Sequence, residues 1–115
     1  MRLRLGYAWQ GIVVAWRKER SFRTQTGFAI ALPIALLLLR ASPVWWAICL
    51  IVALLVLAAE LFNTALESLI DHLHPEIHPA IKIAKDCAAG AVLLLSAGAV
   101  IVGIIVVLVA LGVWS

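Results

Sequence analysis

Charged residues are scarce in this 115-residue chain, at 13% of the sequence, whereas 65% of its residues are hydrophobic. Soluble domains average roughly 45–50% apolar and about 25% charged residues, so this composition excludes a soluble enzyme. It also excludes disordered tails and linkers, which are rich in charge and poor in apolar residues. The composition is that of a membrane protein, and at this length there is room for a single domain.

Cysteine is equally rare, with two residues, Cys49 and Cys87. This excludes a dense disulfide framework, and because each lies within or beside an apolar run we expect both to behave as small hydrophobic side chains. Segment 1–23 lacks a small-residue cleavage site, so we expect no signal peptide. No Walker pattern or kinase-type glycine loop occurs. Any nucleotide must therefore be held by side chains and metal.

Three apolar stretches separate the charged segments, at residues 27–39, 44–59 and 88–114. A bilayer core requires about 20 helical residues, so the first two stretches need polar flanks to complete a span. Pro43, in the tight turn between them, suits the first turn of a new helix. We therefore predict an all-α membrane protein with three transmembrane helices and an amino-terminal amphipathic surface helix. The predicted segments are a surface helix at 1–23, spans at 24–40, 44–70 with a cytoplasmic extension, and 83–114, and a cytoplasmic loop at 71–82.

Charge is distributed unevenly along the chain. Six cations against one carboxylate occupy residues 1–23, whereas five acids against two lysines occupy residues 60–86. Because segments rich in lysine and arginine remain in the cytoplasm, we expect the amino terminus and residues 60–85 inside and the Arg40 turn outside. Four apolar side chains of the first segment recur at helical spacing, which is typical of an interfacial helix that either anchors the chain or carries function. They are Leu5, Trp9, Ile12 and Trp16.

Four polar side chains after the second apolar stretch share one helical face, which we call the acidic stripe. Its members, at spacings of three and four residues, are Glu60, Asn63, Glu67 and Asp71. They fall within an arc of roughly 80°. An ionised carboxylate at membrane depth is costly unless it is paired, hydrated or metal-bound. We therefore interpret Glu60 and Glu67 as functional.

A second source of carboxylate favours a site for a hard cation beside this stripe. Glu19 and Arg23 share the face of Trp9 and Trp16 if the surface helix continues, and they would then point toward the bundle. Mg²⁺ takes one or two protein carboxylates and fills its other positions with water and phosphate oxygens. Together with Lys85 at the start of the third span, this indicates phosphoryl transfer. The opposing interpretation is a structural network in which Lys85 or Arg23 pairs with the acidic stripe.

Three histidines gather near Glu76 in residues 72–79. They would allow a zinc site. Two prolines and irregular spacing instead favour a cytoplasmic turn in which an imidazole contacts a base or a ribose.

The chain resembles the prokaryotic diacylglycerol kinase family over nearly its whole length. The resemblance rests on AELFNTALE at 59–67 followed by Asp71, on His78-Pro79 and Lys85-Asp86, and on KERSFR at 18–23. It implies a lipid kinase of the bacterial inner membrane, with its active site facing the cytoplasm, that transfers the γ-phosphate of ATP to the primary hydroxyl of a lipid. It also implies a homotrimer with active sites shared between subunits.

The resemblance further implies roles for individual residues. By this similarity Glu60 is the general base, supported by Asn63, while Glu19 and Glu67 hold Mg²⁺ on the ATP phosphates. Lys85, oriented by Asp86, would neutralise the phosphate chain. The other residues expected near the nucleotide are Tyr7, Asp71, Glu76, Ile77 and His78. Those expected near the lipid, besides Glu60, are Trp9, Arg23 and Ala89.

The family divides into enzymes that act on diacylglycerol and enzymes that act on undecaprenol. Residues 78–92 look more like the undecaprenol kinases, because the diacylglycerol type usually has a Ser-Gly-Arg-Ala-Lys-Asp run and a serine where Ala89 stands. Thr24-Gln25 also departs from the Gln-Glu of the diacylglycerol type. We therefore expect undecaprenol as the acceptor.

Two other classes of function remain open. A small proton or cation transporter would explain intramembrane carboxylates. A proton relay would however place acids across the whole membrane depth, whereas every acid here is expected in the cytoplasmic half of the membrane or in the cytoplasmic loop, and the third span offers no polar partner. The other class is a non-catalytic assembly protein, in which the acidic stripe pairs only with Arg23 and Lys85. We expect no nucleic-acid partner.

Overall fold

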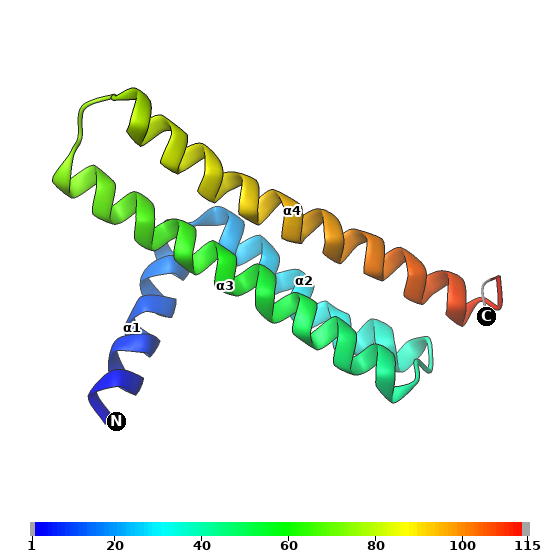
Figure 1. Ribbon diagram of the computed structural model, residues 1–115. Coiled ribbons are helices and arrows are strands. Elements are labelled where there is room, and N and C mark those ends of the chain that lie inside the picture. Colours follow the sequence, from blue (N-terminus) through cyan, green and yellow to red (C-terminus); the bar gives the residue numbers. More distant parts are fainter. Residues whose placement is uncertain (1, 114–115) are drawn as a thin grey trace.

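The computed structural model describes residues 2–113, which form the helices α1 (Arg2–Lys18), α2 (Arg20–Leu38), α3 (Pro43–Leu73) and α4 (Pro79–Ala110). Helix α3 packs against both α2 and α4 in an antiparallel arrangement, and α1 crosses the bundle and contacts α2 and α3 (Figure 1). Helices α2, α3 and α4 are each long and apolar enough to span a membrane. The predicted all-α class with three membrane-length helices is therefore confirmed.

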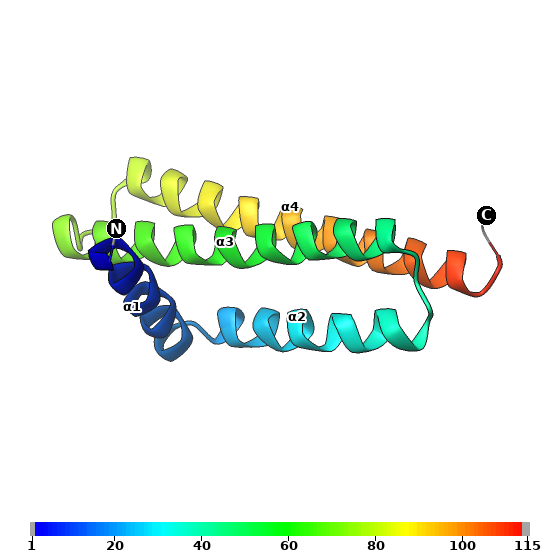
Figure 2. The same ribbon diagram turned by 90° about the horizontal axis from the view of Figure 1, so that it is seen from below.

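Helix length determines where the polar part of the molecule lies. At about 1.5 Å per residue, the 19 residues of α2 cover ~28 Å, whereas the 31 and 32 residues of α3 and α4 cover ~46–48 Å. A tight turn, with Arg40 at φ 54°, joins α2 to α3, so α3 extends well past the start of α2. With α4 it forms a two-helix projection that ends in the loop of residues 74–78 (Figures 1 and 2).

The backbone leaves the helical conformation at Glu19, which has φ −107° and ψ 109°. The surface helix, predicted at 1–23, thus ends at Lys18, and the expected continuation of one helix through Arg23 is wrong. The side chain of Arg23 instead folds back, and its Nη1 donates to the carbonyl oxygens of Trp16 at 2.6 Å and Arg17 at 3.2 Å. These carbonyls end α1 and lack partners within it, so Arg23 caps α1 from the first turn of α2.

The remaining boundaries also shift from the predicted segments. Helix α3 continues to Leu73 and α4 begins at Pro79, so the connecting loop is shorter than the predicted 71–82. His78 provides the reason, because its Nδ1 accepts a hydrogen bond from the backbone N–H of Ala80 at 3.1 Å and so caps α4. Residue 114, the predicted end of the third span, lies outside the described residues.

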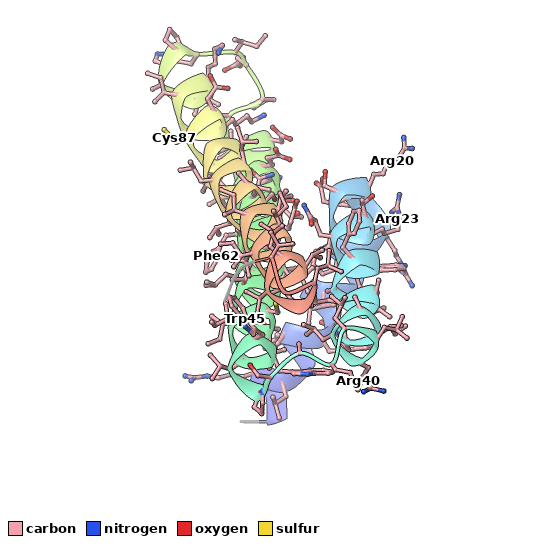
Figure 3. All side chains as sticks on the ribbon, turned by 90° about the vertical axis from the view of Figure 1, so that its right-hand side faces the viewer. Arg20, Arg23, Arg40, Trp45, Phe62 and Cys87 are labelled. Atoms are coloured by element: carbon pink, nitrogen blue, oxygen red, sulfur yellow. The ribbon has the colours of Figure 1, made fainter. Side chains whose placement is uncertain are left out.

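Few apolar side chains are buried within one chain. Leu36, Cys49 and Val106 form a cluster near the α2–α3 turn, against which Trp45 and Trp46 pack. Cys49 thus behaves as the expected small hydrophobic side chain, whereas Cys87 is exposed. Most large apolar side chains of the long helices face outward (Figure 3). Such surfaces suit contact with lipid or with other membrane helices.

Candidate functional site

The centre of the acidic stripe is Glu60, which is 3% exposed. It directly follows the apolar stretch of α3, and its backbone oxygen accepts a hydrogen bond from Thr64 Oγ1 at 3.0 Å. No hydrogen bond or salt bridge reaches its carboxylate from the side chains that the structure describes. A buried carboxylate without a counter-charge destabilises a fold. Its presence therefore indicates chemistry rather than packing.

Two further carboxylates surround Glu60. Helix α2 begins beside this part of α3, and Glu19 at its amino terminus therefore comes close to the acidic stripe. Glu19 and Glu67 both lie near enough to Glu60 for their charges to repel it. The structure thus brings together carboxylates from two segments that are about 40 residues apart in sequence.

Asn63 links this cluster to the next turn of α3. Its Nδ2 donates to Glu67 Oε1 at 3.3 Å. Because the carboxylate accepts from the amide nitrogen, the amide oxygen faces elsewhere, and Asn63 Oδ1 is buried without a hydrogen-bond partner among residues 2–113. Buried acceptors in native proteins nearly always have a partner. The oxygen is therefore available to a ligand.

The oxygen donors at this site fit a hard cation that is completed by other ligands. No group of three His, Cys, Asp or Glu side chains that could hold a metal occurs within residues 2–113. Mg²⁺, however, needs only one or two protein carboxylates when phosphates supply the rest, and Glu19, Glu67 and Asn63 Oδ1 offer such donors. The histidines give no support to a zinc site. The rings of His74 and His78 stack edge to face with centroids 6.0 Å apart.

The two lysines at the start of α4 are each paired with an acid. Lys85 Nζ donates to Asp71 Oδ1 at 2.6 Å, and Lys82 Nζ donates to Asp86 Oδ2 at 2.6 Å. The expectation that Asp86 orients Lys85 is therefore wrong. Neighbouring residues on a helix point about 100° apart, so Asp86 faces Lys82 one turn earlier while Lys85 faces α3.

The structural network that opposed the functional interpretation is thus present at one end of the acidic stripe. Lys85 pairs with Asp71, whereas Arg23 caps α1 and pairs with no member of the stripe. Asp71, expected near the nucleoside, is the partner of Lys85. Glu60 and Glu67 have no salt bridge with any described side chain.

The other predicted site residues are exposed in the single chain. Tyr7 and Trp9 are about two-thirds exposed on α1, and Ile77 is 96% exposed in the loop beside His78. Glu76 contacts His74 in that loop, and Ala89 lies on an exposed face of α4. None of these side chains is hydrogen-bonded to the acidic stripe in the part of the chain that the structure describes.

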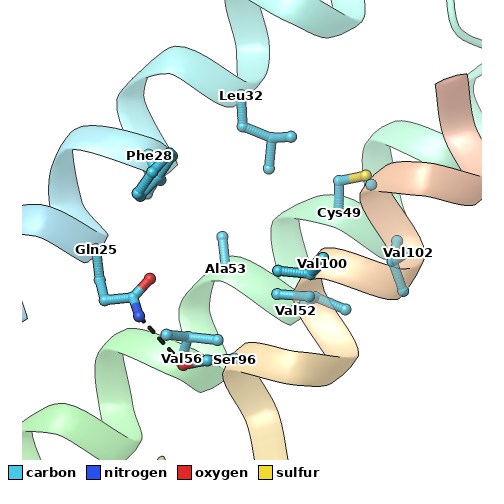
Figure 4. Close-up of a pocket in the computed structure, with 13 residues that line it drawn as sticks. Gln25, Phe28, Leu32, Cys49, Val52, Ala53, Val56, Ser96, Val100 and Val102 are labelled. Atoms are coloured by element: carbon cyan, nitrogen blue, oxygen red, sulfur yellow. Dashed lines mark hydrogen bonds between the residues drawn. The ribbon is translucent and has the colours of Figure 1, made fainter. Parts of the chain in front are cut away.

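One polar contact was missed from the sequence. Gln25 Nε2 in α2 donates to Ser96 Oγ in α4 at 3.1 Å, so the expectation that the third span offers no polar partner is wrong. The pair lies in an apolar groove of about 330 Å³ between α2, α3 and α4 (Figure 4). Val56 lines this groove one turn before Glu60. Ser96 is a single polar residue within an apolar run of α4, and this was the available signal in the sequence.

Comparisons with known proteins identify relatives of this chain. The profile of a family described as prokaryotic diacylglycerol kinase matches residues 6–107. A diacylglycerol kinase of Synechocystis sp. is 45% identical over 98 residues, which cover 84% of this chain and 56% of that protein. An undecaprenol kinase of Bacillus subtilis is 34% identical, covering 89% and 83%, and a diacylglycerol kinase of Escherichia coli K12 is 33% identical, covering 87% and 79%.

These comparisons have two consequences. The chain spans little more than half the length of the Synechocystis relative. The relatives are bacterial and bear the names of kinases, so with its three apolar helices the chain is a multi-pass bacterial membrane protein, and the transporter interpretation gains no support.

Proposed function

Because this chain belongs to the prokaryotic diacylglycerol kinase family, we propose that it is a lipid kinase that transfers the γ-phosphate of ATP to the primary hydroxyl of a membrane lipid. The observation that carries this proposal is Glu60, a residue that is 3% exposed, follows the groove-lining Val56 by one turn and forms no salt bridge with any described side chain. A carboxylate in such surroundings is suited to take up a proton.

We assign proton transfer to Glu60 and its support to Asn63. Glu60 takes the proton from the lipid hydroxyl as the hydroxyl oxygen bonds to the γ-phosphorus. The bond between that phosphorus and the bridging oxygen breaks, ADP leaves, and Glu60 later passes the proton to water. Asn63 supports this step because it holds Glu67 through its amide nitrogen. A loose phosphoryl-transfer transition state needs mainly positioning and charge neutralisation.

The nucleotide and the metal are proposed to bind between the start of α2 and the polar ends of α3 and α4. Glu19 and Glu67 would hold Mg²⁺, which when bound neutralises charge on the phosphates. Lys85 would bind the phosphate chain, with Asp86 near it. The residues proposed to line the rest of the nucleotide are Tyr7, Glu76, Ile77 and His78, whereas Asp71, also expected there, is the partner of Lys85. The family resemblance supports a homotrimer in which neighbouring subunits complete each site, and the exposed Tyr7 and Ile77 are accessible to such neighbours.

For the lipid acceptor we propose undecaprenol. Residues 78–92, including Ala89, support this choice, and so does the departure of Thr24-Gln25 from the Gln-Glu of the diacylglycerol type. Trp9 and Arg23 would lie near the lipid at the interface. The excess of cations in residues 1–23 supports a site that faces the cytoplasm across the bacterial inner membrane.

The test is phosphate transfer from labelled ATP to undecaprenol or diacylglycerol in mixed micelles, with and without Mg²⁺. We expect Mg²⁺-dependent label in undecaprenol. Replacing a general base typically costs about 10²- to 10⁴-fold in rate, so Glu60→Gln should lose at least that much. Thr64→Val is the matched control, because it alters a buried polar side chain one turn away and leaves the carboxylate in place.

Each failure has a separate meaning. Absence of label in both lipids refutes the kinase proposal, and preferential label in diacylglycerol refutes the proposed acceptor. A Glu60→Gln variant at full rate refutes the assignment of the base alone. Glu67→Gln should raise the Mg²⁺ concentration required for half-maximal rate, and an unchanged requirement would remove Glu67 from the metal site.

A further inference from the structure

The ion pair between Lys85 and Asp71 joins the start of α4 to the end of α3 across a distance of 2.6 Å between Nζ and Oδ1. It is partly open to water, since the side chains of Lys85 and Asp71 are 37% and 64% exposed. Asp86, next to Lys85 in sequence, is occupied by Lys82. Asp71 is therefore the anion that the fold supplies to Lys85.

The same ammonium group is the one proposed to bind the phosphate chain. A lysine ammonium is a compact charge with three donors, and a phosphate placed on it would lie close to the carboxylate already bound there. Two anions at one cation repel each other unless one of them withdraws. Asp71 can withdraw at low cost, because most of its side chain already faces water and exposed ion pairs are weak.

We propose that Asp71 is an intramolecular competitor for the phosphate-binding Lys85: its carboxylate holds the ammonium group in the nucleotide-free protein and is displaced by the incoming phosphates. The inference rests on the proposed function and adds a regulatory contact to that site. Asp71 then lowers the affinity for the phosphate chain. A role as a nucleoside contact predicts the opposite effect, since its removal would weaken binding.

Inorganic triphosphate separates the two roles, because it carries the phosphate chain without a nucleoside. Its binding with Mg²⁺, and that of MgATP, would be measured by titration calorimetry on the full chain in micelles. Exposed ion pairs contribute about 0.2–1 kcal/mol, so Asp71→Asn should tighten triphosphate binding about 1.5- to 5-fold. Asp71→Ala provides a second variant with the same expected direction.

The matched control is the same change in a Lys85→Met background, where the pair no longer exists. If Asp71 acts through Lys85, Asp71→Asn has no effect there. Unchanged or weaker triphosphate binding in the single variants overturns the inference. Tighter binding that persists in the Lys85→Met background also overturns it, because the tightening would then be a general effect of charge. If the wild-type chain binds MgATP and phosphorylates lipid but Asp71→Asn binds triphosphate no more tightly, this inference alone is refuted. If the wild-type chain does neither, the proposed function is refuted and the inference with it.

Discussion

The hydrogen bond between Gln25 and Ser96 leads to a quantitative prediction about the bundle. In Ser96→Ala the part-buried Gln25 amide loses its acceptor in an apolar groove. A fully buried unsatisfied donor costs about 1–3 kcal/mol, so we expect a loss near the lower end of that range. In Gln25→Leu the Ser96 hydroxyl can return to a carbonyl of its own helix, so we expect the smaller loss. Hydrogen bonds between membrane helices are worth on average about 0.6 kcal/mol and at most about 1.7 kcal/mol. The loss in free energy of unfolding of the double variant should therefore be smaller than the sum of the two single losses by that amount.

The cycle requires the free energy of unfolding of all four proteins. Sodium dodecyl sulfate titration of mixed micelles, followed by tryptophan fluorescence, provides it, because the chain has five tryptophans. Ser68→Ala serves as a control, since Ser68 is exposed on α3 and exposed substitutions usually change stability by less than about 0.5 kcal/mol. Strictly additive losses from Gln25→Leu and Ser96→Ala would refute the idea that this pair holds α2 to α4.

Two further predictions concern the helix ends. Arg23→Gln removes the charged donor from the carbonyls of Trp16 and Arg17, so trypsin should cleave between α1 and α2 several-fold faster than in the wild-type protein. Arg23→Lys should be cleaved at an intermediate rate. Equal cleavage of all three proteins would argue against a cap. His78→Ala should lose about 0.5–2 kcal/mol of stability because α4 loses its cap. His78→Asn should retain most of that stability, because asparagine can also cap a helix. Equal losses of the two variants in the same unfolding titration would contradict the capping role.

The long helices could be predicted from sequence because their signals are local. Apolar runs of membrane length, a proline at the start of α3 and uneven charge are all properties of neighbouring residues. The break at Glu19 could not be predicted in this way, since no glycine or proline marks it. The break depends on the side chain of Arg23 reaching the end of α1 and on α1 packing against α3.

The site was predictable to the same extent. Spacings of three and four residues place Glu60, Asn63 and Glu67 on one face of a single helix, and this requires no knowledge of the fold. The partner of Lys85 lies 14 residues earlier on another helix, and that of Gln25 lies 71 residues later. Contacts between helices depend on how the helices are rotated against each other, which local sequence does not determine.

The distribution of counter-charge separates a structural role from a chemical one. If the acidic stripe served only to join helices, cations would be placed where an unpaired carboxylate costs most, beside the apolar stretch of α3. The arrangement is the reverse, because the more exposed Asp71 near the end of α3 has Lys85 as its partner, whereas the buried Glu60 has no salt bridge among the described side chains. Arg23, which the structural interpretation paired with the acidic stripe, instead donates to carbonyl oxygens of α1. Selection for stability alone would favour replacing Glu60 by an apolar residue, so its retention in this environment is best explained by a reaction that needs a carboxylate there.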